Sequence, residues 1–341
     1  MTKEVKNRLD NLLTYLRDQK KRLVIDADTH ISDLEELDTY QKSLYNSSQD
    51  YYHGKPINVE QLISEMDMSD VNMSLCWINP AVIKNSNTQS ENFELLRSAI
   101  RYLVKSSEKY PTRIIPTGWI DIKALGLEKS KELVMECVKE MGLLVIKMNP
   151  AQSSYPMDHQ DVCILVKFIV KLGAIPAFHY GSDTLFTTPE NLVTIASLIY
   201  PHKLIAVHMG GGGASYLEGE TNYNKTRELG FKFDNIYFVE STKRDTHIES
   251  DFISYVAAGE KYYKRIMCGS DAPYGRQSWN YGGYRSMFST LKNPSLHTDI
   301  RIRNREAIFT DEIIQRIMGE NLADLLIEGY NNSTFSSWIN T

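Results

Sequence analysis

Five acidic or imidazole side chains stand at or just beyond the ends of short apolar runs in this chain: Asp28, His30, His179, His208 and Asp271. Carboxylates and imidazoles are ligands that proteins offer to Zn²⁺, Mn²⁺ and Fe²⁺. Asp28 and His30 are two residues apart, so on an extended segment their side chains point the same way. Singly, a strand-end histidine is more often a hydrogen-bonded core residue, and Asp271 is placed to cap a helix. Together they predict a site for one divalent metal.

The runs that carry these residues are short, nearly continuous in apolar character and often β-branched, as strands buried on both faces of a parallel sheet are. Eight such strands are predicted, at 23–27, 72–78, 114–120, 143–147, 174–179, 203–208, 235–239 and 264–269. Helical patterns follow them, at 91–108, 128–141, 158–172, 189–199, 213–229, 248–258, 281–291, 311–317 and 319–327. Eight β-then-α units predict an α/β fold, a (β/α)8 TIM barrel, whose catalytic groups stand at the carboxyl ends of the strands.

Two segments lie outside this regular pattern. The N-terminal residues predict an amphipathic helix, with one face made of Val5, Leu9, Leu12, Leu13 and Leu16. We therefore predict a helical extension at 1–21, one barrel domain at 22–330 and a tail at 331–341. The connection at 32–70 is rich in tyrosine and far exceeds the usual βα loop of about 2–6 residues. A lid, a substrate wall, an oligomer contact and a structural cover all fit this long loop after the first strand.

Composition excludes several classes of protein. The formal net charge of −5 argues against a nucleic-acid partner, because such binders neutralise phosphates with a basic surface. No run approaches the ~18–20 apolar residues of a membrane span, and the N-terminus does not have the pattern of a secretory signal. The four cysteines are scattered through apolar runs without a C-x-x-C pair, which indicates buried free thiols. We expect a soluble cytoplasmic enzyme.

Six segments, taken in order, carry a family resemblance: VIDADTH, GLLVIKMNP, IPAFHYGSD, LIAVHMGGG, RIMCGSDAPYG and IMGENLADLL. They resemble the amidohydrolase-related group of the amidohydrolase superfamily. This branch includes aminocarboxymuconate-semialdehyde decarboxylase, resorcylate-type decarboxylases and pyrone-dicarboxylate lactonase. The resemblance spans about residues 22–327 and implies a metal-dependent enzyme on a TIM barrel.

The resemblance assigns one divalent metal, Zn²⁺ first and Mn²⁺ as the alternative, to Asp28, His30, His179 and Asp271. It makes Asp271 and His208 the catalytic residues, with His208 as an acid–base or a substrate polariser. The usual motif on the first strand of the family is His-x-His, and Asp28 stands where its first histidine would be. This departure leaves open whether Asp28 binds the metal directly, and it favours a harder ion such as Mn²⁺.

Five further side chains are candidates for substrate contact. Lys147, Lys243 and Arg276 are cations on the predicted fourth strand and on the loops after the seventh and eighth. Each has the charge to hold a substrate carboxylate, although surface positions are commoner for such residues. For Lys147 we favour a solvated or substrate-facing ammonium over a carboxylated lysine that bridges two metals. Trp77 and Tyr180 can wall a flat substrate or serve as core aromatics.

Three functions are compatible with this pattern. The first is a metal-dependent hydrolase, in which a metal-activated water attacks a small amide, lactone or ester. The alternative is a non-oxidative, metal-dependent decarboxylase of a small aromatic or unsaturated acid. The third is a barrel without catalysis that acts as a binding protein. In each case we expect a small-molecule partner, with carboxylates among the candidates, and by analogy a homodimer.

Overall fold

The computed structural model of the 341-residue chain describes residues 2–48, 53–181, 185–211, 216–242 and 245–331, with the backbone alone over 216–222. Its strands are β1 (Ile25–Ile31), β2 (Met73–Ile78), β3 (Ile114–Pro116), β4 (Gly118–Ile120), β5 (Val145–Met148), β6 (Ile175–His179), β7 (Leu204–Val207), β8 (Ile236–Glu240) and β9 (Ile266–Cys268). All neighbouring strands pair in parallel, in chain order from β1 to β3 and from β4 to β9. The eight predicted strands are therefore present.

One predicted strand, 114–120, is divided into β3 and β4 by Thr117. The β3 part pairs with β2, and the β4 part pairs with β5. Thr117 turns its hydroxyl back to donate a 2.6 Å hydrogen bond to the Cys76 carbonyl. The segment therefore changes its partner at this residue and links the two sheets into one curved wall.

The ring closes between β1 and the segment that follows β9. The Asp271 amide donates to the Asp28 carbonyl at 2.8 Å, and the His30 amide donates to the Ala272 carbonyl at 2.6 Å. A single parallel bridge pairs Thr29 with Ala272, and the register of β1 shifts between Asp26 and Thr29. The predicted (β/α)8 barrel is confirmed, and an irregularity in β1 lies at its closing seam, as bulges next to active sites often do.

A buried carboxylate clamps this seam. Asp26 is fully buried and accepts hydrogen bonds from the Ser270 amide at 2.9 Å, the Ser270 hydroxyl at 2.5 Å and the Gln277 amide at 2.7 Å. It also accepts from the Asp28 amide at 3.0 Å. Burial raises the pKa of Asp26 to about 7 against the effect of these donors. The Asp26 side chain thus joins β1, which carries the candidate ligand Asp28, to the segment after β9, which carries Asp271.

Replacing this clamp by Asp26→Ala should cost about 3 kcal/mol of unfolding free energy, because it leaves several buried donors without an acceptor. Urea unfolding followed by circular dichroism measures this loss. Asp18→Asn, on the exposed side of the N-terminal helix, is the control and should change stability by less than about 0.5 kcal/mol. A loss below about 1 kcal/mol for Asp26→Ala would show that the seam does not depend on the clamp.

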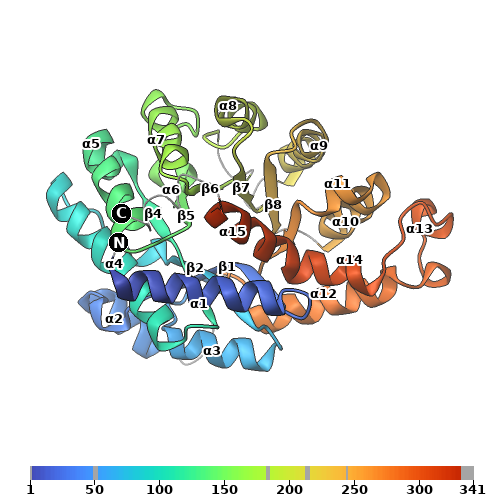
Figure 1. The fold of residues 1–341 in the computed structure, drawn as a ribbon, viewed down its shortest axis with the longest axis horizontal. Coiled ribbons are helices and arrows are strands. Elements are labelled where there is room, and N and C mark those ends of the chain that lie inside the picture. Colours follow the sequence, from blue (N-terminus) through green and yellow to red (C-terminus); the bar gives the residue numbers. More distant parts are fainter. Residues whose placement is uncertain (1, 49–52, 182–184, 212–215, 243–244, 332–341) are drawn as a thin grey trace.

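Helices surround the strands, most visibly from α4 to α10 (Figure 1). Their bounds are α1 (Lys3–Gln19), α2 (Thr39–Ser47), α3 (Val59–Met68), α4 (Gln89–Lys109), α5 (Ile122–Met135), α6 (Pro150–Ser153), α7 (Gln160–Lys171), α8 (Pro189–Ile199), α9 (Tyr216–Lys232), α10 (Asp245–Ala258), α11 (Glu260–Tyr263), α12 (Gln277–Leu291), α13 (Ile300–Arg303), α14 (Asp311–Gln315) and α15 (Asn321–Asn331). The predicted N-terminal helix is α1, which packs beside α15 and buries four of its five predicted apolar residues, while Val5 is half-buried.

The long connection after β1 contains α2 and α3, which the sequence pattern did not predict. Its later part packs on the loop after β9: the ring of His53 lies 5.2 Å from the ring of Tyr274, centroid to centroid. Gly54 has a left-handed φ of 75°, and a Cβ at this position would lie 2.8 Å from the Tyr274 ring. The segment therefore forms a wall beside the barrel mouth; whether it also moves as a lid remains a prediction.

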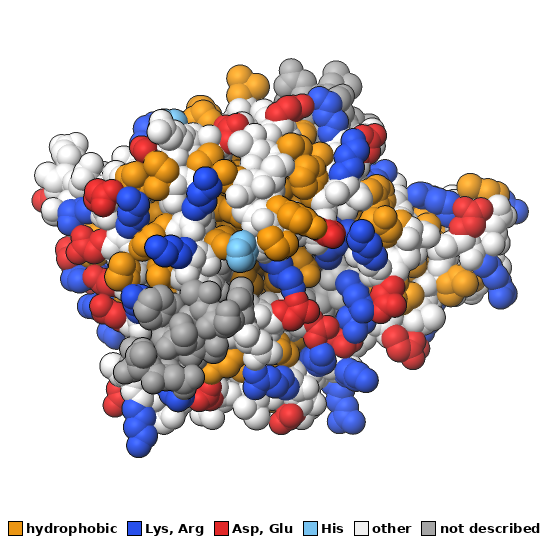
Figure 2. All heavy atoms as spheres, turned by 45° about the horizontal axis from the view of Figure 1, so that its top comes forward, with side chains coloured by type: hydrophobic (Ala, Val, Ile, Leu, Met, Phe, Trp, Pro, Cys, Tyr) orange, Lys and Arg blue, Asp and Glu red, His pale blue; other side chains and the backbone are white. Residues whose placement is uncertain are grey.

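The outer surface mixes charges of both signs. Figure 2 shows Lys and Arg side chains interspersed with Asp and Glu on the visible face rather than gathered in one basic area. Among the described residues, no helix combines the length and apolar character needed to cross a bilayer. The cysteines are free thiols: Cys76, Cys137 and Cys268 are buried as predicted, whereas Cys163 is half-buried.

Candidate metal centre

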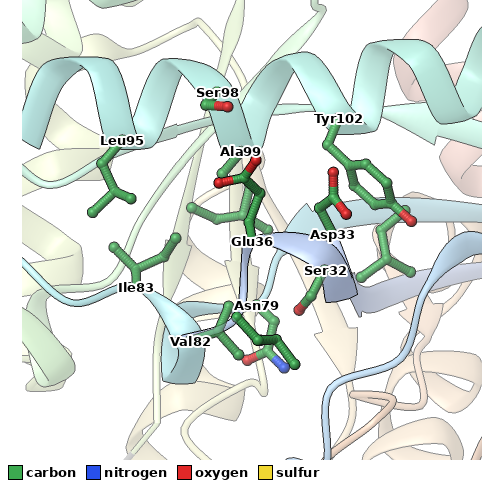
Figure 3. Close-up of a pocket in the computed structure, with 13 residues that line it drawn as sticks. Ser32, Asp33, Glu36, Asn79, Val82, Ile83, Leu95, Ser98, Ala99 and Tyr102 are labelled. Atoms are coloured by element: carbon green, nitrogen blue, oxygen red, sulfur yellow. The ribbon is translucent and has the colours of Figure 1, made fainter. Parts of the chain in front are cut away.

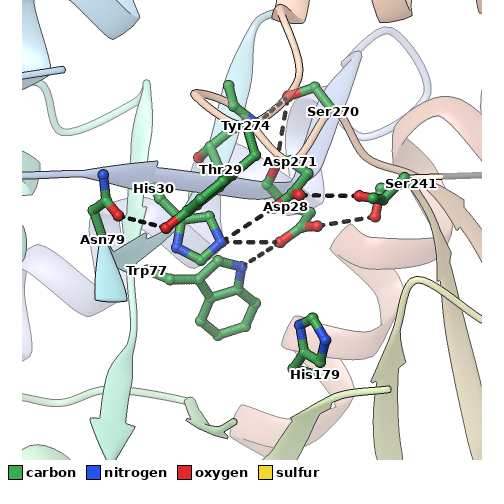
Figure 4. A network of polar contacts seen from close by, with 12 residues as sticks. Asp28, Thr29, His30, Trp77, Asn79, His179, Ser241, Ser270, Asp271 and Tyr274 are labelled. Atoms are coloured by element: carbon green, nitrogen blue, oxygen red, sulfur yellow. Dashed lines mark hydrogen bonds and ion pairs between the residues drawn. The ribbon is translucent and has the colours of Figure 1, made fainter. Parts of the chain in front are cut away.

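Three of the four predicted ligands converge at the carboxyl ends of β1 and β9. A ligand atom from each of Asp28, His30 and Asp271 lies within 4.8 Å of the other two, and all three residues are buried. His30 Nε2 is 3.7 Å from Asp28 Oδ1 and 3.4 Å from Asp271 Oδ1 (Figure 4). We call these three residues the metal triad. Asp28 and His30 point the same way from β1, as their spacing predicted.

The triad has the geometry and chemistry of a cation site. Ligand atoms bound at about 2.1 Å to one ion lie about 3.0–3.4 Å from each other, which is close to the separations of the triad. The His30 ring donates its Nδ1 hydrogen to the Ile78 carbonyl at 2.7 Å, since a carbonyl can only accept. Its second nitrogen, Nε2, faces the two carboxylates. Nε2 is the atom that a metal-binding histidine offers when Nδ1 donates to a carbonyl. The residues therefore fit a divalent cation.

Asp28 is held in place by three donors from three other strands or strand ends. Its Oδ1 accepts from Trp77 Nε1 at 3.0 Å and lies 3.3 Å from Lys147 Nζ. Its Oδ2 accepts from the Ser241 hydroxyl at 2.9 Å. A carboxylate offers about four lone-pair positions, so Asp28 retains capacity for a metal ion. Such partners around a ligand fix its orientation and tune its affinity for the metal.

A hydrogen-bonded relay connects Asp28 to both remaining histidines. Because Ser241 donates its one hydrogen to Asp28, its oxygen accepts from His208 Nδ1 at 2.8 Å. Burial lowers the pKa of His208 to about 4, so the ring is neutral at pH 7 and its Nε2 is an acceptor. His179 Nδ1 lies 3.1 Å away and therefore donates to it. Since Nδ1 makes this bond, Nε2 is the nitrogen of His179 that could bind a metal.

His179 itself does not belong to the metal triad. It reaches the centre through His208, and Figure 4 shows its ring apart from the other three residues. Its role as the fourth ligand, taken from the family pattern, remains a prediction. His208 Nδ1 lies 3.6 Å from Asp28 Oδ2, so His208 is a neighbour of this candidate ligand.

The backbone is strained where these residues leave their strands. His208, Thr242 and Asp271 adopt left-handed φ values of 76°, 54° and 55°. Non-glycine residues rarely adopt such values, and they collect at functional sites. The Thr242 hydroxyl donates to Asp271 Oδ2 at 2.9 Å. Burial alone would raise the pKa of the Asp271 carboxyl, but the hydrogen bond from His30 and nearby positive charge hold it well below its usual range.

Lys147 is a buried cation beside the triad. Its side chain is 1% exposed, and its Nζ lies 4.5 Å from the ring centre of Trp77 and 5.6 Å from that of Trp119. Burial lowers its pKa, and the carboxylate of Asp28 opposes this shift. A buried lysine needs such a partner, because its charge is otherwise costly. The structure thus turns Lys147 inward toward the centre, so the ammonium is not solvated, and its contact with a substrate stays a prediction.

Of the other candidate substrate residues, Tyr180 and Arg276 lie away from the centre. Tyr180 is 1% exposed and its hydroxyl pairs with Thr226 at 3.0 Å, so it packs as a core residue rather than at the centre. Arg276 contacts Glu65 of α3 at 3.2 Å and lies over the ring of Trp279. Trp77 does lie at the centre, as a buried donor to Asp28. Lys243 falls outside the described residues.

Three residues that the sequence did not single out also shape the centre. Ser241 bridges Asp28 and His208, Trp119 stands 6.2 Å from the His30 ring in an edge contact, and Asn79 accepts a 2.8 Å bond from the Tyr274 hydroxyl. Ser241 and Asn79 directly follow the last residues of β8 and β2, and Trp119 lies within β4. Strand-end position was the only available signal, and it does not distinguish a functional hydroxyl, amide or indole from the many others.

A small cavity of about 70 Å³ lies behind the centre, between the ends of β1 and β2 and helix α4 (Figure 3). Asn79 Oδ1 accepts from the Ala81 amide at 3.0 Å, which fixes the orientation of the carboxamide. Asn79 Nδ2 and Ser32 Oγ are buried polar atoms of this lining without a hydrogen-bond partner among the described residues. A cavity of this size and polarity accommodates a few ordered waters, which would satisfy both atoms.

Comparison with known proteins decides the family. The chain matches the amidohydrolase family over residues 25–326, which includes every residue of the metal triad and the relay. The protein belongs to the amidohydrolase family. The family resemblance that the six ordered segments predicted is therefore confirmed. The prediction of a metal-dependent enzyme, a hydrolase or a carboxy-lyase, is confirmed with it. No curated protein matches this amidohydrolase-family chain at a significant level.

Several solved structures share its fold at low sequence identity. A 2,6-dihydroxybenzoate decarboxylase in complex with 2,6-dihydroxybenzoate has a TM-score of 0.64 and 14% identity, with 89% of this chain and 98% of that chain covered. A dihydroxybenzoic acid decarboxylase from Polaromonas sp. JS666, with bound manganese and 2-nitroresorcinol, has a TM-score of 0.62, 15% identity and coverage of 92% and 98%. A 5-carboxyvanillate decarboxylase from Sphingomonas paucimobilis has a TM-score of 0.61, 13% identity and coverage of 89% and 98%.

The hydrogen bonds of Ser241 to Asp28 and His208 should affect the affinity of the site for its metal. Ser241→Ala should weaken Mn²⁺ binding about 10- to 100-fold, because a ligand loses the partner that orients it. Isothermal calorimetry on metal-stripped protein measures this change. Ser130→Ala is the matched control, since Ser130 is also fully buried but its hydroxyl has no partner among the described residues. Equal Mn²⁺ affinity in the two variants would exclude the bridge as a determinant of the site.

Proposed function

We propose that this protein is a metal-dependent, non-oxidative decarboxylase of a small hydroxylated aromatic acid, in place of the hydrolase first expected. The observation that carries the proposal is the buried ammonium of Lys147, which lies within 5.6 Å of the centres of two indole rings and 3.3 Å from Asp28 of the metal triad. Indole faces bind a flat ring, while a metal ion and a buried ammonium bind its carboxylate. The three solved decarboxylases of similar fold support this proposal, because each is named for a hydroxylated benzoic acid.

Asp28, His30 and Asp271 would hold the metal, with His179 as the proposed fourth ligand. When bound, the ion supplies a positive charge that orients the substrate carboxylate and a neighbouring oxygen. We propose Mn²⁺ as the native metal, because two carboxylates make the donor set hard. Manganese is also the metal in the structure from Polaromonas. Zn²⁺, the ion first expected from sequence, is the competing candidate.

The chain's own residues then move one proton. Asp271 is ionised in the resting enzyme, so it accepts the proton of the substrate hydroxyl next to the carboxylate. It returns this proton to the ring carbon that bears the carboxylate, where a ring electron pair forms the new C–H bond. The C–C bond then breaks, its electron pair restores the aromatic ring, and CO₂ leaves. The phenolate product takes one proton from solvent, which balances the reaction.

His208 has a supporting role in this scheme. It is neutral, and it is hydrogen-bonded on both ring nitrogens, to Ser241 and to His179. It therefore orients two metal ligands and stabilises the transition state as a fixed dipole rather than as a charged acid. Lys147 offsets the charge of the carboxylates and meets the substrate anion.

The proposal is tested with metal-stripped protein and 2,6-dihydroxybenzoate, whose loss is followed by ultraviolet absorbance. Mn²⁺ should restore turnover, and Lys147→Met should lower kcat/KM by about 100-fold or more, since a buried charge facing the substrate is lost. Lys171→Met, on the exposed end of α7, is the control and should change little. Hydrolysis of an aryl lactone by the Mn²⁺ protein, with 2,6-dihydroxybenzoate left intact, would return the assignment to a hydrolase.

Two further expectations belong to the same proposal. A homodimer is predicted by analogy with barrels of this kind, and sedimentation equilibrium of the full chain measures it. The arm that carries α13 extends away from the barrel (Figure 1) and exposes Leu296 and Ile300, which makes it a candidate contact. A cytoplasmic location is the second expectation, and it rests on composition alone.

A further inference from the structure

A polar groove lies at the barrel mouth, along the carboxyl ends of β2, β4 and β5. It encloses about 550 Å³, within the range of about 300–1,000 Å³ that is usual for small-molecule sites. Its lining includes Asn85, Asn92, Trp119, Asp121, Lys123 and Gln152. None of these residues except Trp119 contacts the metal triad in the part of the chain that the structure describes. The groove therefore has a size and a chemistry that the proposed reaction does not explain.

Trp119 connects this groove to the metal centre. It lines the groove, yet its ring stands 6.2 Å from the ring of His30 and 5.6 Å from the Lys147 ammonium. It points into the barrel, because its neighbour Gly118 faces outward, where an added Cβ would meet Cys137 of the helix layer. A substrate bound at the triad that extends past Trp119 therefore enters the groove.

The walls of the groove are preorganised. Asp121 Oδ1 caps helix α5 by accepting from the Lys123 and Ala124 amides, both at 3.1 Å. Its Oδ2 accepts from Asn85 Nδ2 at 3.2 Å and from the Ser153 hydroxyl at 2.8 Å. Four donors thus satisfy this carboxylate, which leaves it little tendency to recruit a cation. A fixed wall reduces the entropy that binding would otherwise cost.

The remaining chemistry of the groove is polar and close to neutral. Gln152 donates to the Pro80 carbonyl at 3.0 Å and presents its amide at the rim. Lys123 is exposed and donates to the Ser154 carbonyl at 3.3 Å, and its charge is the opposite of that of Asp121, the one acidic residue of the lining. Carboxamides and hydroxyls dominate the lining, beside one indole, one carboxylate, one ammonium and a few apolar side chains. This combination suits hydroxyl or amide groups on a ligand better than a hydrocarbon or a second carboxylate.

We infer that the polar groove binds a neutral, hydroxyl- or amide-bearing arm of the substrate, whose acid end lies at the metal triad. The inference rests on the proposed function and narrows its substrate class: the natural acid carries a polar extension and is larger than a simple hydroxybenzoate. Trp119 packs against the junction between the ring and the arm, and the amide-rich wall at Gln152 and Asn85 recognises the arm.

The experiment compares two probes that differ only in the arm. Both are 2-hydroxybenzoates with a carboxamide at position 4, one N-substituted with 2,3-dihydroxypropyl and the other with butyl. Calorimetry with the Mn²⁺ protein should give a Kd about 10-fold lower for the dihydroxypropyl probe, because its hydroxyls meet partners in the groove. In Gln152→Leu and in Asn85→Ala this ratio should approach 1, while Gln160→Leu, on the exposed start of α7, should retain it. An equal or lower Kd for the butyl probe would overturn the inference.

A third probe separates this inference from the proposed function. N-(2,3-dihydroxypropyl)benzamide lacks the carboxylate and the phenol, so its binding does not depend on decarboxylation. Saturation-transfer NMR should detect its contact with the native protein and lose that contact in Gln152→Leu. If the contact is present and no acid is decarboxylated, the groove assignment holds and the proposed reaction is wrong. If acids are decarboxylated and no arm is preferred, the reaction holds and the groove assignment is wrong.

Discussion

Asp271→Asn should lower turnover of 2,6-dihydroxybenzoate by about 10³-fold at saturating Mn²⁺, because the proposed proton carrier is removed. The amide has nearly the same shape, and it keeps the bond from the Thr242 hydroxyl through its carbonyl oxygen. The loss should therefore appear in kcat, with a smaller change in KM. Steady-state kinetics over a range of Mn²⁺ concentrations separates this effect from weaker metal binding.

The comparison variant for this prediction is Asp18→Asn, an exposed acid on α1 that is remote from the mouth. It should leave both kinetic constants unchanged within error. If Asp271→Asn retained more than about a tenth of the native kcat once Mn²⁺ is saturating, another group would have to carry the proton, since general acid–base catalysis contributes about 10²–10⁴-fold. His208 would then be the next candidate, although its lowered pKa argues against it.

His30→Ala should abolish retention of the metal. His30 contributes the one imidazole of the triad, and its Nε2 lies within 3.7 Å of both carboxylates. Without it, the two buried carboxylates repel each other and the ion loses a nitrogen ligand. We expect elemental analysis to find about one Mn²⁺ per native chain after dialysis and less than about 0.1 per chain of the variant. Loss of a residue that only orients a ligand lowers metal affinity about 10- to 100-fold, and loss of the ligand itself should lower it further.

Thermal unfolding gives an independent reading of the same prediction. Mn²⁺ should raise the Tm of the native protein, because a ligand that binds only the folded state stabilises it, and this rise should be absent in His30→Ala. His202→Ala is the control, since His202 is exposed and lies after α8, away from the mouth. Undiminished stabilisation of His30→Ala by Mn²⁺ would show that the metal binds elsewhere.

Most of the barrel could be predicted because its strands are buried on both faces and hence read as continuous apolar runs. The division of 114–120 could not, since it depends on Thr117 bonding across to the carbonyl of Cys76, a contact between distant segments. Helix α3 was missed although its signals are present in the sequence. Asn58 and Gln61 form a capping box, and Leu62 and Met66 are buried one turn apart.

The metal triad was predictable for a different reason. Asp28 and His30 share one strand, and Asp271 follows the last strand of the ring, so barrel closure alone brings them together. The sequence was a weaker guide to His179. Its ring is joined to the centre through a hydrogen bond with His208, and the sequence does not specify this contact between two strand ends. Ser241 and Trp119 act through such side-chain contacts, which depend on packing that a single sequence does not specify.

The most direct test of the central claim is a product analysis of the Mn²⁺ protein with 2,6-dihydroxybenzoate labelled with ¹³C at the carboxyl carbon. The account predicts that the label leaves as ¹³CO₂ and bicarbonate in the ¹³C NMR spectrum, in amounts equal to the resorcinol formed, and that metal-stripped protein releases none. Retention of the label in the intact acid, together with turnover of an ester or lactone in the same tube, would contradict it.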